Sequence, residues 1–216
     1  MEESLVFLKP DAVLRRSIGA AILQEFLKND DKFSIVAFKE VQVSADLAKK
    51  HYQEHEGKIF FPWLVKSICS APVLAMIVQG EIQQIRDFLG ATFVQKAELG
   101  TIRGRFGIWG GVNSVHASDS PENGRRELDL WKNLASLNKD LNALKKIKDY
   151  ITKWINTLKE ENVFKLRNLC RNLTENQSRK EEVHRDLTRI LAEECPLSDT
   201  QTIRNFANII IENVLL

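Results

Sequence analysis

The sequence predicts an α+β fold over residues 1–131, followed by an all-α extension over residues 132–216. Up to residue 131, short apolar runs rich in β-branched residues alternate with segments of helical periodicity. From residue 132 onwards glycine is absent and proline occurs once, at Pro196. A chain of 216 residues is long enough for two modest domains.

The elements of the first part follow from local patterns. Apolar or alternating runs predict strands at residues 5–8, 33–43, 72–78 and 106–109. Apolar residues at helical spacing predict helices at 17–28, 44–52, 60–69, 81–89 and from residue 121, with Ser44 and Ser120 as N-caps. Two βαβ units that share one antiparallel sheet would form a ferredoxin-like sandwich.

The extension is expected to be helical throughout. Apolar residues recur every three or four positions from Leu134 to Leu158, which predicts one long amphipathic helix, and the spacing resumes from Val163 to Leu173. Possible capping boxes at Ser178 and Ser198 predict two further helices. These helices could form a small bundle or an arm, and the first seam could instead be a coiled coil between subunits.

Composition excludes several classes. The net charge of +2 gives no general argument for nucleic acid or for an anionic membrane. One face of the first extension helix is basic, but such a run is usually a solvated face, so binding of nucleic acid through it is a minor alternative. The face comprises Lys139, Lys145, Lys146, Lys148, Lys153 and Lys159.

The N-terminus and the cysteines suggest a cytoplasmic protein. The acidic start Met1-Glu2-Glu3-Ser4 and the break at Lys9-Pro10-Asp11 fit neither a signal peptide nor a membrane span. Cys69, Cys170 and Cys195 are far apart and odd in number, which is typical of reduced thiols and lacks metal-ligand spacing.

The segment Asn113 to Ser120 carries the strongest functional signal. His116 lies there among short polar residues, just before the predicted helix start at Ser120-Pro121. An imidazole is partly unprotonated near neutral pH and can act as a nucleophile, although a single histidine is more often structural. Glu127, eleven positions later, could orient the ring.

Other residues strengthen this hypothesis. Lys9 ends a buried strand. Arg86, Thr92 and Arg103 could form a clamp for a polyphosphate, because one guanidinium group can donate two parallel hydrogen bonds to phosphate oxygens. The chain also contains the uninterrupted Gly100-Thr101-Ile102-Arg103-Gly104 and, later, the pattern Asn-x-x-His-x-Ser-Asp. These residues, and the number of positions between the two motifs, resemble the nucleoside diphosphate kinase family over roughly residues 4–131.

The resemblance implies roles for individual residues. His116 would be the phosphorylated nucleophile, Lys9 would contact the transferred phosphate, and Glu127 would hold the imidazole tautomer with support from Ser118. Phe60 and Leu64 would sandwich the nucleobase, whereas core packing is the alternative for them and for Tyr52. Tyr52 and Asn113 would shape the site, Mg²⁺ would be carried by the nucleotide phosphates, and His51 and His55 are expected to be surface histidines.

The implied activity is transfer of the γ-phosphate of ATP, or of another nucleoside triphosphate, to a nucleoside diphosphate in a ping-pong reaction. The family also implies a homo-oligomer, and the N-terminal sequence gives no reason to expect a membrane partner. The alternative is an inactive nucleotide-binding scaffold whose helical extension recruits a partner. The sequence departs from the family pattern at Thr92-Phe93-Val94, at Arg105 and at Val112.

Overall fold

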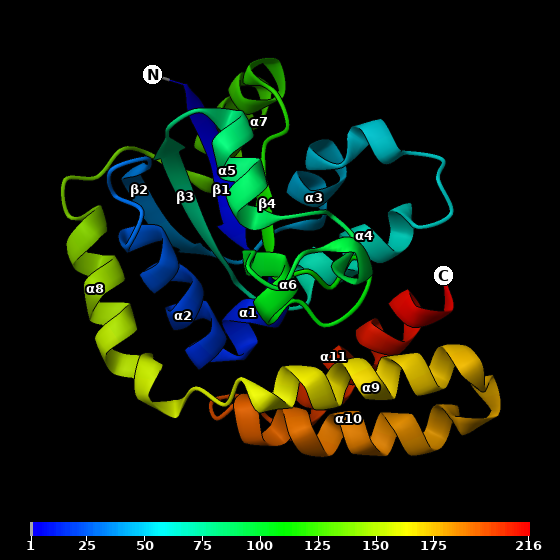
Figure 1. Ribbon diagram of the computed structural model, residues 1–216. Helices are drawn as coiled ribbons and strands as arrows, with labels where there is room; N and C mark the ends of the chain where they lie inside the picture. Colours follow the sequence, from blue (N-terminus) through cyan, green and yellow to red (C-terminus); the bar gives the residue numbers. More distant parts are fainter. Residues whose placement is uncertain (1) are drawn as a thin grey trace.

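A four-stranded antiparallel sheet lies at the centre of the computed structural model, which describes residues 2–216 (Figure 1). Its spatial order is β2-β3-β1-β4, and every neighbouring pair is antiparallel. The strands are β1 (Glu3–Leu8), β2 (Ser34–Val41), β3 (Val73–Gln79) and β4 (Val115–Ala117). The predicted α+β sandwich is therefore confirmed.

Helices cover both faces of the sheet, because side chains of β1 alternate between two cores. Val6 and Leu8 pack into one core, and Leu5 and Phe7 pack into the other. The first core is covered by α1 (Pro10–Leu14), α2 (Arg16–Leu27), α5 (Ile82–Leu89), α6 (Ile102–Phe106) and α8 (Ala143–Trp154). The second is covered by α3 (Ala45–His51), α4 (Phe61–Cys69) and α7 (Pro121–Ala135).

The predicted helix starts are confirmed where a short polar side chain caps them. The Ser44 hydroxyl accepts a hydrogen bond from the backbone N–H of Leu47, and the Ser120 hydroxyl accepts one from Asn123. Each bond satisfies a backbone donor that the first helical turn leaves unpaired. α7 thereby begins five residues after His116, at Pro121.

The strand predicted at residues 106–109 is wrong. Phe106 ends α6, and the segment that follows makes only an isolated bridge between Trp109 and Val112 within residues 2–216. Gly110 has φ +48, a left-handed conformation that turns the chain instead of extending it. The fourth strand is β4, which carries His116 at its centre.

The single long helix predicted from Leu134 to Leu158 is also wrong. α7 ends at Ala135 because Ser136 adopts a left-handed conformation with φ +51, and α8 begins only at Ala143. Ile147 and Ile151 of α8 pack into the same core as the apolar residues of α2. Figure 1 shows α8 beside α2. The second half of this apolar stripe is thus packed within the chain, whereas Leu134, Leu141 and Leu144 are exposed.

The remaining helices form a bundle below the sheet in Figure 1. They are α9 (Glu161–Glu175), α10 (Lys180–Glu194) and α11 (Thr200–Leu215). The expected caps are displaced: Asn176, and not Ser178, caps the short turn before α10, and Asp199, and not Ser198, caps α11. Both are Asx side chains, which cap as well as serine does.

The bundle packs on the sheet domain through a third core. Leu166, Leu187 and Phe206 of the bundle share this core with Trp63 and Val112 of the sheet domain. The buried ion pair between Arg15 Nε and Glu194 Oε2, at 2.8 Å, joins the same two parts. The helices α9, α10 and α11 are therefore docked, as a bundle, on the part of the chain that forms the sheet.

The basic face and the cysteines have ordinary surroundings. Lys139, Lys145, Lys146 and Lys159 each lie within ion-pair distance of a carboxylate, so the face is partly neutralised. Cys69, Cys170 and Cys195 are free thiols, as expected. Within residues 2–216, we find no helix that combines the length and the apolarity needed to cross a bilayer.

Candidate functional site

A cleft of about 650 Å³ opens beside β4, between α4 and the chain that follows α5. It brings together ten of the eleven residues proposed from the sequence, and the eleventh, Ser118, lies directly behind it. The ten lining residues are Lys9, Tyr52, Phe60, Leu64, Arg86, Thr92, Arg103, Asn113, His116 and Glu127.

His116 is fixed by the sheet and by one hydrogen bond. It pairs with Phe7 in the register of β1 and β4, and its ring stacks on the Phe7 ring with centroids 4.6 Å apart. Its Nε2 lies 3.1 Å from Glu127 Oε2. Among the described residues, no hydrogen bond engages Nδ1, so this nitrogen is available to the cleft that His116 lines.

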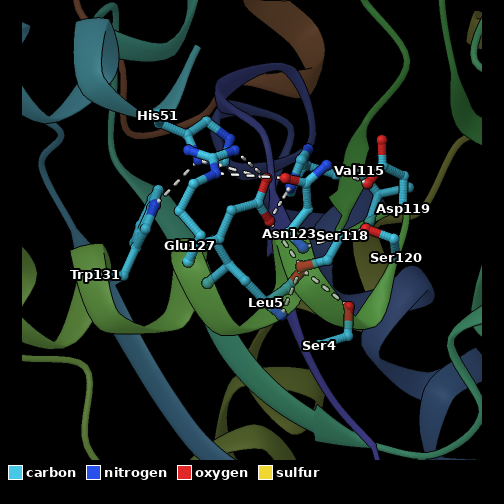
Figure 2. Close-up of polar contacts among 12 residues, drawn as sticks. Ser4, Leu5, His51, Val115, Ser118, Asp119, Ser120, Asn123, Glu127 and Trp131 are labelled. Atoms are coloured by element: carbon cyan, nitrogen blue, oxygen red, sulfur yellow. Dashed lines mark hydrogen bonds and ion pairs between the residues drawn. The ribbon is translucent and has the colours of Figure 1, made fainter. Parts of the chain in front are cut away.

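Glu127 is held from behind by Ser118. The Ser118 hydroxyl donates to Glu127 Oε2 at 2.7 Å and accepts from the backbone N–H of Leu5 at 3.1 Å (Figure 2). Burial would raise the pKa of Glu127, but the charge and hydrogen bonds of His116 and the contacts of His51 and Ser118 lower it to about 2. Glu127 is therefore ionised at neutral pH, so it accepts a hydrogen bond from the N–H at His116 Nε2, and in this tautomer Nδ1 carries the lone pair.

The expectation that His51 is a surface residue is wrong. Its ring is only 2% exposed and lies edge-on to the His116 ring, with centroids 4.7 Å apart. Trp131 Nε1 donates to His51 Nδ1 at 3.4 Å, and burial lowers the pKa of His51 to about 3 (Figure 2). A neutral His51 therefore restricts the orientation of His116. The signal was available, because Leu47 and Ala48 place His51 on the buried face of α3.

Three cations face the cleft from different elements. Lys9 follows β1, Arg86 lies in the last turn of α5, and Arg103 lies in α6. Burial and the neighbouring Arg103 lower the pKa of Lys9 to about 8, and burial together with Arg86 lowers the pKa of Arg103 to about 10. Grouping three like charges costs free energy, and an anionic ligand would recover it.

The polar residues around these cations are positioned by the backbone. Arg103 donates from Nη1 to the Gly90 carbonyl at 2.6 Å and from Nη2 to the Val115 carbonyl at 3.0 Å. Asn113 donates to the Thr92 carbonyl at 2.6 Å, while its own Oδ1 is buried without a partner. Arg103 and Asn113 thus tie the loop after α5 to the segment that enters β4.

The other end of the cleft is apolar and open. Phe60, at the start of α4, is 38% exposed, and Leu64 lies one turn further along the helix. The Tyr52 ring is buried beside His51, and burial raises the pKa of its hydroxyl, so Tyr52 stays protonated. His55, which is half-buried, also lines this end and is not a free surface residue. A flat apolar group fits here better than a charged one.

Two lining residues could not be inferred from the sequence. Asn213 and Leu216, at the end of α11, complete the wall of the cleft about 100 positions away from Asn113. No local motif marks them, because only the docking of the bundle brings them to this position.

One cluster of side chains in the lining has the residue types of a metal site. His51, His116 and Glu127 each place a potential ligand atom within 4.8 Å of the others, but two of them already form the hydrogen bond described above. Mg²⁺ prefers oxygen ligands and retains several waters, and it commonly binds substrate phosphates. The remaining carboxylates in the lining are those of Glu54 and Asp119, and they are not among the residues whose ligand atoms cluster.

An imidazole among cations is suited to the transfer of a charged group, and the flat apolar end is suited to a nucleobase, so the fold and the cleft fit a nucleotide phosphotransferase. More particularly, the chain belongs to the nucleoside diphosphate kinase family, whose sequence model matches residues 2–135. The match ends at the last residue of α7, so residues 136–216 lie outside it.

Relatives and solved structures agree with this assignment. A nucleoside diphosphate kinase from Methanothermobacter thermautotrophicus is 52% identical over 133 residues, which are 61% of this chain and 87% of the relative. One from Chloroflexus aggregans is 49% identical over 134 residues, covering 61% and 87%. The crystal structure of the Aquifex aeolicus nucleoside diphosphate kinase aligns at 32% identity with a TM-score of 0.57, covering 63% of this chain and 99% of that one. The apo structure from Encephalitozoon cuniculi gives 32% identity, a TM-score of 0.58 and coverages of 68% and 99%.

Two departures from the family pattern lie where the bundle docks. Val112 is buried in the core that the sheet domain shares with α9, α10 and α11. Arg105 donates to Glu160, just before α9, and to Glu25 of α2. A charged arginine in place of Val112 would meet the apolar core of the bundle, so this departure matches the presence of the extension.

Proposed function

We propose that the protein is a nucleoside diphosphate kinase that works through a phosphohistidine at His116. The Nδ1 lone pair attacks the γ-phosphorus of a nucleoside triphosphate, a nitrogen–phosphorus bond forms, and the bond to the β,γ-bridging oxygen breaks, so the diphosphate leaves. A second diphosphate then attacks the phosphohistidine by the reverse route. The observation that supports this proposal is that Nε2 is bound to Glu127 while Nδ1 is free.

The neighbouring residues would neutralise the phosphate charge and position the nucleotide and the His116 ring. Lys9, Arg86 and Arg103 neutralise the phosphate oxygens, and Thr92 and Asn113 complete the binding of the phosphate tail. Glu127 fixes the tautomer of His116 and stabilises the ring when it is phosphorylated, and Ser118 holds Glu127. Mg²⁺ bound to the phosphates would offset further negative charge when the nucleotide arrives.

The apolar end of the cleft would bind the base without reading it closely. Phe60 and Leu64 offer apolar contact to either face of a base, while Tyr52 closes the pocket next to His51. Stacking uses a π-face that all bases share, so ATP and other nucleoside di- and triphosphates should all serve as substrates.

We further propose a cytoplasmic homo-oligomer. The three free cysteines suit a reducing compartment. Phe93 is 57% exposed and Leu99 is 67% exposed on the loop between α5 and α6, which offers apolar surface to another subunit. Sedimentation velocity of the full chain should give a mass at least twice the 24.7 kDa of one chain, and a monomer at micromolar concentration would contradict the oligomer.

Initial-velocity kinetics test the proposed mechanism. With ATP and GDP as the varied substrates, double-reciprocal plots should be parallel, since the first product leaves before the second substrate binds. Intersecting lines would indicate direct transfer in a ternary complex. Tight binding of ADP without any transfer would favour the inactive scaffold.

The pKa of Lys9 predicts how nucleotide binding depends on pH. Because this pKa is about 8 in the free protein, Lys9 loses its charge as the pH rises through 8, and only the charged form attracts phosphate. The Kd for ADP should therefore increase about tenfold between pH 7 and pH 9. In Lys9→Arg the profile should be flat over this range. Calorimetric titration measures both, and a flat wild-type profile would contradict the assignment of Lys9.

A further inference from the structure

The last helix of the extension connects the two walls of the cleft. On one side, Trp63 of α4 donates from its indole nitrogen to the Ile209 carbonyl at 2.9 Å, and Lys66 forms an ion pair with Glu212. On the other side, the Asn213 amide oxygen accepts from the backbone N–H of Gly111 at 3.0 Å. α11 thus contacts both the helix that carries Leu64 and the turn that precedes Asn113.

The turn is shaped for this contact. A Cβ atom on Gly110 would lie 2.6 Å from Asn213 Oδ1, and one on Gly111 would lie 2.9 Å from the Trp63 ring. Gly110 also has a positive φ, +48, which side chains rarely adopt. Both glycines therefore allow Asn213 and Trp63 to approach the turn closely.

The same turn contacts the proposed phosphate site. The Lys9 ammonium donates to the Gly111 carbonyl at 3.2 Å, and this is the only hydrogen bond that we find for it among residues 2–216. An ammonium has three donors, so the other two remain for phosphate oxygens. Gly111 hence receives a bond from Lys9 at its carbonyl and gives one to Asn213 at its N–H.

We propose that Asn213 is a positioning residue of the nucleotide site: it holds the Gly110–Gly111 turn, and through the Gly111 carbonyl it places Lys9 for the phosphates. The helical extension is in this way a component of the phosphate-binding machinery and is more than an appended bundle. This inference rests on the proposed function, because it requires Lys9 to bind phosphate.

The test compares two ligands that differ only in their phosphates. Asn213→Ala should weaken the binding of ADP about five- to tenfold and leave the Kd for adenosine within twofold, because a lost hydrogen bond to the turn displaces Lys9 and not the base contacts. Asn208→Ala, on an exposed position of the same helix, is the matched control and should change neither Kd. Calorimetric titration of the full chain measures the six constants, two for the wild type and two for each variant.

A double-mutant cycle provides the second readout. In a Lys9→Met background, Asn213→Ala should have no further effect on ADP binding, since the two residues act through one contact. If the losses of ADP affinity in the two single variants multiply in the double variant, the proposal is overturned. Equal weakening of ADP and adenosine binding in Asn213→Ala would also overturn it, because this would indicate a general opening of the cleft. If the wild type binds ADP but transfers no phosphate, the proposed function fails while this inference stands. If Asn213→Ala binds ADP like the wild type, this inference fails while the proposed function stands.

Discussion

His116→Ala is expected to abolish phosphate transfer between nucleotides. Removal of a covalent nucleophile leaves only binding and charge stabilisation, so kcat should fall by about four orders of magnitude or more. The ring packs on Phe7 and is partly exposed, so its loss should leave the fold intact. A coupled assay with ATP and GDP measures the rate.

The control for this experiment is another histidine of the same chain. His184 lies on α10, outside the cleft, so His184→Ala should keep the wild-type rate. ADP should still bind to His116→Ala, because the cations and the apolar end of the cleft are unchanged. A variant without His116 that retained more than about a tenth of the activity would exclude the imidazole as the nucleophile.

The second large effect is expected at the interface between the sheet domain and the bundle. In Glu194→Leu the guanidinium of Arg15 would remain buried, with 0% of its side chain exposed, but without its carboxylate partner. An uncompensated buried charge should lower the free energy of unfolding by about 3–5 kcal/mol. Denaturation in urea, followed by tryptophan fluorescence, measures the change.

A compensating variant separates lost charge pairing from lost packing. Arg15→Met combined with Glu194→Leu should recover most of the stability, because two apolar side chains of similar volume suit the site. A loss of less than about 1 kcal/mol in Glu194→Leu would mean that water reaches Arg15 when the carboxylate is removed, and so that the bundle docks less closely. Activity should decrease with stability, since α11 forms part of the cleft wall.

Local signals in the sequence predicted the elements that carry the proposed chemistry. Apolar runs located β1 and β3, and the serine caps located the starts of α3 and α7. The fourth strand was placed wrongly, because Phe106 to Trp109 is as apolar as a strand but is followed by Gly110 and Gly111, which turn the chain. Three residues are enough for β4, and so short a segment carries no periodicity.

Tertiary contacts explain the other differences. The apolar spacing between Leu134 and Leu158 is real, but a left-handed Ser136 divides it, and serine is not a residue that marks such a break. The pairing of Arg15 with Glu194 depends on two residues that are distant in the sequence. The position of Asn213 has the same origin. Such contacts have no signature in a single sequence, whereas the spacing around His116 does.

The most direct test of the account is to isolate the phosphorylated protein. After brief exposure to ATP labelled at the γ-phosphate and removal of free nucleotide, the label should be acid-labile and stable to alkali, and it should map to the peptide that contains His116. Addition of GDP should transfer the label to GTP. A label found on another residue, or a label on His116 that GDP cannot remove, would contradict a phosphohistidine intermediate.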